Sequence, residues 1–140
     1  MNTPTPRALC ALHTSVVIVW LGTALVSALD YWGCLGSAQY GPQLLKDAGI
    51  HSPSLQTALI WSGLLADLVI GMWLWLRPGR IAYVAAVTLM TGMTLAGTML
   101  HPTLWLHPLG PLLKNLSIAA ALWVLWQAQP AQQTSSERTS

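Results

Sequence analysis

The sequence predicts an all-α integral membrane protein, a four-helix bundle of up-down-up-down topology with both termini in the cytoplasm. Three observations lead to this prediction. The chain of 140 residues is 54% hydrophobic and only 7% charged, far more apolar than a soluble domain. Its apolar residues fall in four blocks, at about residues 8–29, 55–76, 81–100 and 111–127. No block alternates like a barrel strand, so helices must satisfy the backbone in lipid.

The lengths of the blocks decide how each meets the bilayer. A helix needs about 20 apolar residues to cross about 30 Å of hydrocarbon, and three blocks reach this length. The fourth rises only about 24 Å, at about 1.5 Å per residue. It spans only if its entry turn, around Pro108 and Gly110, lies below the headgroups or the bilayer thins locally. We therefore expect the connection before this block to be turn-like and partly re-entrant.

Basic residues predict the orientation. Four arginines lie on one side of the four-span arrangement and two lysines on the other: Arg7, Arg77, Arg80 and Arg138 against Lys46 and Lys114. By the positive-inside rule the arginine side faces the cytoplasm, as expected for a multi-pass protein of the inner (cytoplasmic) membrane. Residues 8–127 are expected to form the four-helix transmembrane domain. Residues 1–7 and 128–140 are polar and are expected to be disordered.

A secretory signal peptide is the alternative interpretation of the N-terminus. Arg7 precedes an apolar run that ends in the small residues Val26-Ser27-Ala28, which resemble a cleavage site. The run is longer than the roughly 7–15 residues of a signal core, which favours a retained helix. Cleavage would leave three spans and place the new N-terminus outside.

Two charges near or within the apolar blocks are the strongest functional candidates. Asp67 is expected about 15 Å from the cytoplasmic end of its helix, where a carboxylate costs about 2.5–3.5 kcal/mol on insertion scales. Lys114 is expected only about 5 Å from the same depth. We hypothesise that the two side chains form a buried ion pair. The alternative is that Lys114 extends to the outer headgroups.

Other polar and small residues extend this candidate site. Asn115 and His107 are expected in the same outer half of the bundle as Asp67 and Lys114, and polar groups that converge in an apolar surround are typical of a ligand pocket. We assign no catalytic residue. Small residues flank Asp67 on one helical face and predict close approach of a neighbouring helix there, at Gly63 and Gly71. A hydroxyl stripe on the third block is expected to serve helix packing: Thr88, Thr91 and Thr98.

The longest connection, residues 30–54, is expected on the outer side. Within it, residues 43–48 form a short amphipathic pattern that ends at Gly49. Such a segment is typical of a helix lying at the membrane surface. A lid-like interfacial helix is therefore expected at this end of the bundle.

Composition and spacing exclude several classes of function. The net charge of +2 without a basic cluster argues against nucleic-acid binding. Cys10 and Cys34 are expected about 30 Å or more apart, which excludes a disulfide, and no Cys-x-x-Cys motif supports a thiol relay. His13 has no mate at its depth for a bis-histidine haem. We predict no metal site; the less favoured alternative is a site where the outer histidines meet: His51, His101 and His107.

One run carries a resemblance to a known family. The segment His107-Pro108-Leu109-Gly110-Pro111-Leu112-Leu113-Lys114-Asn115-Leu116, together with Ala66-Asp67-Leu68, Gly71 and Arg77-Pro78, resembles the DoxX-like family of small four-helix membrane proteins. The resemblance extends from about Arg7 to Trp126. Ser117 is a mild departure, since the family often has proline there. Members occur alone or fused to NAD-dependent epimerase-like domains, and the wider superfamily includes a membrane subunit associated with thiosulfate:quinone oxidation.

The resemblance implies a membrane subunit whose polar pocket serves a redox partner. The chain has no glycine fingerprint for a dinucleotide, so an oxidoreductase partner would be a separate subunit. Besides that subunit, the lipid bilayer is the expected partner. The residues require no cofactor, and a quinone is the class that we consider. The alternatives are a structural or anchoring subunit without its own ligand and, less favoured, a small transporter that uses Asp67 as a proton relay.

Overall fold

The computed structural model describes residues 5–36, 40–100, 102–105 and 113–129, and over these residues it is helical and contains no strand. Its elements in chain order are α1 (Pro6–Tyr31), α2 (Tyr40–Asp47), α3 (Pro53–Leu76), α4 (Arg80–Leu100), the 3-10 helix η1 (Pro102–Trp105) and α5 (Leu113–Ala128). The all-α prediction is confirmed. The helices α1, α3 and α4 are each long and apolar enough to cross a membrane. Helix α5 is shorter, with 16 residues, and the predicted start of its block at residue 111 lies outside the described residues.

Local signals at the helix ends agree with these boundaries. The Thr5 hydroxyl accepts a hydrogen bond from the Ala8 amide at 3.3 Å, and Pro6 follows as the first residue of α1. Gly33, just past the end of α1, has a φ of 71°, a left-handed conformation that suits glycine at a helix C-terminus. Helix α3 likewise begins with a proline, Pro53, after Ser52. Proline and glycine at these positions therefore set where α1 begins and ends and where α3 begins.

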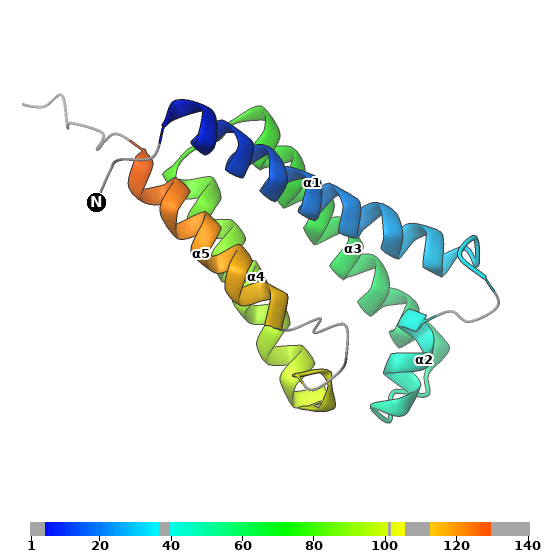
Figure 1. Cartoon of the computed structure of the whole chain (residues 1–140). Coiled ribbons are helices and arrows are strands. Elements are labelled where there is room, and N and C mark those ends of the chain that lie inside the picture. Colours follow the sequence, from blue (N-terminus) through cyan, green and yellow to red (C-terminus); the bar gives the residue numbers. More distant parts are fainter. Residues whose placement is uncertain (1–4, 37–39, 101, 106–112, 130–140) are drawn as a thin grey trace, which may run out of the picture.

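The long helices pack in two pairs. Helix α1 lies along α3, and α4 lies along α5, while α1 also contacts α5 and α3 contacts α4. Helices α1 and α4 run away from the end at which the described chain begins and finishes, and α3 and α5 return to it (Figure 1). We call this the terminal end of the bundle. Helix α2 lies at the opposite end, in contact with α1 and α3.

The hydrophobic core occupies the terminal half of the bundle. In the described part of α4 no residue beyond Met90 is buried, and in that of α5 none before Leu122 is buried. The two helix pairs are close together at the terminal end and diverge toward the α2 end (Figure 1). The buried core cluster contains residues of all four long helices: Val16, Val17, Trp20, Ile70, Leu74, Ala82, Tyr83, Ala86, Met90, Leu122 and Leu125.

Polar contacts also join the helices at the terminal end. The Tyr83 hydroxyl and the His13 Nδ1 are 3.0 Å apart, which links α4 to α1. The Arg80 guanidinium donates to the carbonyl oxygen of Gln129 at 3.0 Å and lies 5.4 Å above the ring of Trp126. These contacts hold the beginning of α4 against the end of α5.

Helix α2 confirms the short helix predicted before Gly49, and it begins earlier than predicted, at Tyr40. The Asp30 carboxylate explains this start. It accepts hydrogen bonds from the amides of Tyr40 at 3.0 Å and of Gly41 at 2.9 Å, so it satisfies free N–H groups at the helix N-terminus. Gly49 has a φ of 84°, as expected for a glycine that follows a helix.

The predicted close approach at the small residues of α3 is confirmed for Gly71. A Cβ atom there would lie 2.6 Å from Cδ2 of Leu21 and 3.2 Å from Cβ of Trp20. Glycine thus lets α1 pack directly on α3. Gly63 lies on a looser contact, since its Cβ would meet only the Met93 methyl at 3.6 Å.

We expect the substitution Gly71→Leu to destabilise the bundle by about 1–3 kcal/mol, because the added side chain must displace Leu21 and Trp20. Thermal unfolding in detergent, followed by circular dichroism, measures the loss. The matched control is Gly92→Leu on α4, where a Cβ would meet no atom within 4 Å. Equal melting temperatures for the two variants would show that α1 does not depend on a small residue at Gly71.

Candidate functional site

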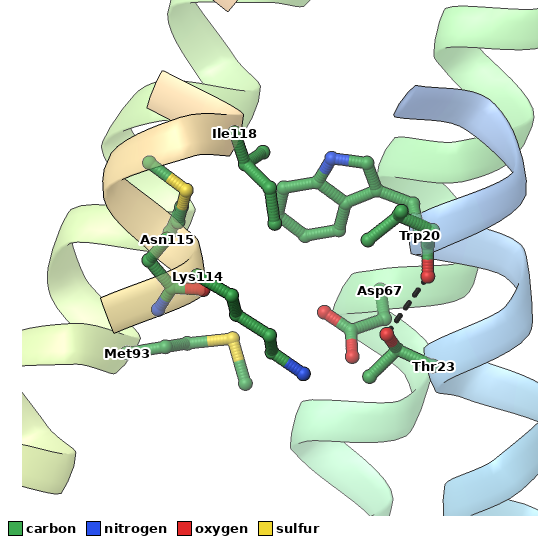
Figure 2. Close-up of a pocket in the computed structure, with 9 residues that line it drawn as sticks. Trp20, Thr23, Asp67, Met93, Lys114, Asn115 and Ile118 are labelled. Atoms are coloured by element: carbon green, nitrogen blue, oxygen red, sulfur yellow. Dashed lines mark hydrogen bonds between the residues drawn. The ribbon is translucent and has the colours of Figure 1, made fainter. Parts of the chain in front are cut away.

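A cavity of about 200 Å³ lies where the two helix pairs begin to separate. Its walls come from all four long helices, and most of the lining is apolar (Figure 2). Three of the four predicted site residues line it: Asp67, Lys114 and Asn115. The fourth, His107, lies outside the described residues. The remaining lining residues are Val19, Trp20, Thr23, Met90, Met93 and Ile118.

Asp67 is the buried charge of the site. It lies on α3, one turn before Gly71, and only 5% of its surface is exposed. Within the described part of the chain its carboxylate forms no hydrogen bond or ion pair. Figure 2 shows the carboxylate turned into the cavity. A carboxylate in apolar surroundings is costly unless it is hydrogen-bonded, and this one borders the cavity, so the group is suited to bind something that donates a hydrogen bond.

Lys114 enters the same cavity from the first turn of α5. Its ammonium group points toward the Asp67 carboxylate (Figure 2), and its positive charge attracts that carboxylate. The residue as a whole is exposed, and the two groups form no direct ion pair in the described structure. The structure therefore brings the two predicted partners into one cavity but keeps them apart across it.

Asn115 connects the cavity wall to the neighbouring helix. Its side-chain amide donates to the Thr94 hydroxyl at 2.8 Å, and that hydroxyl donates to the carbonyl oxygen of Met90 at 2.8 Å. One turn further, the Trp105 indole donates to the Thr98 hydroxyl at 3.0 Å. Polar contacts thus position the first turn of α5 and η1 against α4.

Thr94 is a site residue that the sequence analysis missed. The predicted hydroxyl stripe included Thr98, which has a structural partner, but it did not include Thr94. The signal was present, because Thr94 and Thr98 are spaced i, i+4 and therefore share one face of α4. Asn115 also needed a hydrogen-bond partner in apolar surroundings, and Thr94 supplies it.

Trp20 forms the boundary between the cavity and the core. It belongs to the buried core cluster and also lines the cavity. The Ile118 side chain lies beside its ring (Figure 2). The cavity therefore closes toward the terminal end on a rigid aromatic surface, and the fluorescence of Trp20 can report what occupies it.

The other candidates for metal or thiol chemistry lie elsewhere in the structure. Cys10 and Cys34 are free and exposed. Among the described residues no group of three or more histidine, cysteine or acidic side chains is placed to hold a metal ion. His13 contacts Tyr83 in the core, so its observed role is in packing.

The chemistry available in the cavity is that of an acid and a base held in apolar surroundings. The Lys114 ammonium can donate hydrogen bonds, and the Asp67 carboxylate can accept them. Both groups can also exchange protons. A neutral molecule with oxygens at opposite edges of a ring matches this arrangement, because one edge can accept from Lys114 while the other donates to Asp67.

Comparison with known proteins agrees with the resemblance of the sequence. A family model described as the DoxX-like family matches residues 17–123. The matched region contains every described residue that lines the cavity, including Asp67, Lys114 and Asn115. No curated protein and no solved structure matches the chain.

A double-mutant cycle tests whether the two charges depend on each other. We expect Asp67→Asn and Lys114→Met each to reduce the yield of folded protein, while the double variant loses less than the sum, with a coupling of about 0.5–3 kcal/mol. The physical reason is that each single change leaves an uncompensated charge in the cavity. Size-exclusion chromatography and thermal unfolding in detergent measure the effect. Strictly additive losses would mean that the charges do not interact.

Proposed function

The chain belongs to the DoxX-like family, and we propose that it is a membrane subunit whose polar cavity holds a redox molecule of the quinone class for a separate oxidoreductase. The family and the three long apolar helices identify a membrane protein. The observation that supports the proposal most directly is the cavity itself, in which Asp67, Lys114 and Asn115 converge among apolar side chains.

The proposed placement in the bilayer is a four-span bundle in the inner membrane with the terminal end in the cytoplasm. Large apolar side chains on the outside of the helices support the location in a bilayer, since Ile81 is 74% exposed and Met99 is 85% exposed. Such surfaces are favourable in lipid and unfavourable in water. In the proposed placement α5 is the shortest span, and because it begins beside the cavity, Lys114 is expected in the outer half of the bilayer.

The size and polarity of the cavity support a quinone headgroup. A cavity of about 150 Å³ holds one benzene ring, so the observed volume of about 200 Å³ suits a single substituted ring. In the proposed complex, Lys114 donates to a carbonyl oxygen of the quinone, and Asp67 accepts from a hydroxyl group of the reduced form. A quinone gains protons as well as electrons when it is reduced. Asp67 and Lys114 can exchange these protons, while the partner oxidoreductase supplies the electrons.

A structural or anchoring subunit is the second candidate, and the hydrogen bonds between α4 and the segments after it favour this role. The hydrogen bond between Asn115 and Thr94 holds the beginning of α5 against α4. The hydrogen bond between Trp105 and Thr98 does the same for η1. An anchoring subunit would bind a soluble oxidoreductase stably without a ligand in the cavity. The two candidates therefore differ in whether the purified chain binds a quinone by itself.

Binding of a quinone headgroup by the full chain in lipid nanodiscs tests the proposal. The probe is the hydroquinone form of dimethoxy-methyl-benzoquinone, the reduced ubiquinone headgroup without its tail, whose hydroxyl groups can accept from Lys114 and donate to Asp67. We expect a saturable change of tryptophan fluorescence, with Trp20 beside the site. The variants Asp67→Asn and Lys114→Met should each weaken binding about tenfold or more, because a hydrogen bond to a charged group contributes about 1.5–3 kcal/mol.

The matched controls are Asp47→Asn and Lys46→Met, the same chemical changes at exposed residues of α2 outside the cavity. They should bind the probe like the unmodified chain. Circular dichroism and a melting curve confirm that each variant is folded. Absence of saturable binding would reject a quinone site in this cavity and leave the anchoring role. Folded Asp67→Asn and Lys114→Met variants that bind the probe as tightly as the unmodified chain would do the same.

A further inference from the structure

A second hollow, a groove of about 570 Å³ between α1 and α5, adjoins the cavity. Four residues line both: Val19, Thr23, Lys114 and Ile118. The cavity and the groove therefore meet at these side chains, between α1 and α5. A ligand in the cavity that extended past them would run between α1 and α5, along side chains that are exposed on the outside of the bundle.

The volume of the cavity requires such an exit for a larger ligand. Pockets that enclose a drug-sized molecule have volumes of about 300–1,000 Å³. The cavity, at about 200 Å³, holds one ring and little more. Any long substituent on that ring must lie elsewhere, and the groove shares four lining residues with the cavity.

The residues of the groove suit an apolar chain in contact with the bilayer. Ile18 is 63% exposed and Val26 is 55% exposed, so this part of α1 faces outward. Gly22 lies between them, and a Cβ built there would meet no atom within 4 Å. Unlike Gly71, therefore, Gly22 is not required for helix packing. Its missing side chain instead leaves the groove open at its midpoint.

Lys114 lies where the polar cavity and the apolar groove meet. Its ammonium group points into the cavity toward Asp67 (Figure 2), and the residue also lines the groove. On the α5 side the groove continues along Ser117 and Ile118. A ligand bound along this path has a polar ring beside Asp67 and an apolar chain beyond Lys114.

We propose that the ligand of the cavity is a quinone with an isoprenoid-type tail, and that the tail leaves the cavity between α1 and α5 into the bilayer. This inference rests on the proposed function of the cavity and extends it from the headgroup to the whole molecule. It also assigns Gly22 as a specificity residue, which admits tailed ligands and contributes nothing to binding of the ring.

Two probes and two glycine variants separate the tail from the headgroup. The probes are decylubiquinone, used in its reduced hydroquinone form, and the reduced tailless headgroup, measured by the same saturable change of tryptophan fluorescence with the full chain in nanodiscs. The test variant is Gly22→Leu, which places a side chain in the groove. The matched control is Gly92→Leu, which adds the same side chain at open space on α4, where it lines neither hollow. Because both variants sit in identical bilayers, partitioning of the probes into lipid cancels.

We expect Gly22→Leu to weaken binding of decylubiquinone about tenfold relative to Gly92→Leu, since part of the tail loses its contact with the protein. Binding of the tailless headgroup should change less than twofold, because the cavity is intact. Ser117→Leu, on the opposite wall of the groove, should act in the same direction and provides a second variant if Gly22→Leu does not fold.

The outcomes distinguish this inference from the proposed function. If Gly22→Leu and Ser117→Leu bind decylubiquinone like Gly92→Leu, the tail does not use the groove and the inference is wrong, although Asp67-dependent binding of the headgroup still supports the proposed function. Equal weakening of both probes would also overturn it, because the groove residues would then act on the cavity. If neither probe binds in a manner that depends on Asp67, the proposed function and the inference both fail.

Discussion

The burial of one carboxylate, that of Asp67, is the constraint on which the rest of the structure depends. In a membrane such a charge costs about 2.5–3.5 kcal/mol on insertion scales, so the fold must give it a polar neighbour. The structure does so by leaving a cavity beside it and by directing the Lys114 ammonium into that cavity. One turn further along α3, Gly71 lets α1 pack closely, so the apolar core closes directly on the terminal side of the charge. Helix α3 thus carries both the close contact with α1, at Gly71, and the carboxylate that borders the cavity, at Asp67.

Because the two helix pairs diverge, the buried carboxylate borders a cavity that can bind a ligand. Core residues fill the terminal half, and Trp20 closes the cavity on that side. Toward the α2 end the pairs separate, and the described parts of α4 beyond Met90 and of α5 before Leu122 bury no residue. The hydrogen bond from Asn115 to Thr94 keeps α5 against α4 there, and a groove that shares lining residues with the cavity lies between α1 and α5. A ligand that fills it has to be polar at one end and apolar at the other.

Much of this fold could be predicted from the sequence, and the reasons are local. Apolar blocks bounded by proline and glycine define the long helices, and the amphipathic pattern before Gly49 defines α2. Counting the helical rise placed Asp67 and Lys114 at nearly the same depth, and both line one cavity. The separation of the two charges could not be predicted, because it depends on how far the helix pairs diverge. Gly22 illustrates the same limit: only the structure distinguishes a glycine at open space from one in close contact, such as Gly71.

The central claim is that Asp67 and Lys114 face each other across a site for a ring-shaped ligand rather than holding the helices together. The most direct measurement is anomalous diffraction from crystals of the full chain grown in a lipid phase with a brominated hydroquinone, the reduced form that can donate to Asp67. The proposed site predicts a bromine peak inside the cavity between Asp67, Lys114 and Trp20, and loss of this peak in crystals of Asp67→Asn. Bromine peaks confined to the outer surface of the helices, with Asp67 and Lys114 in direct contact across a closed cavity, would contradict it.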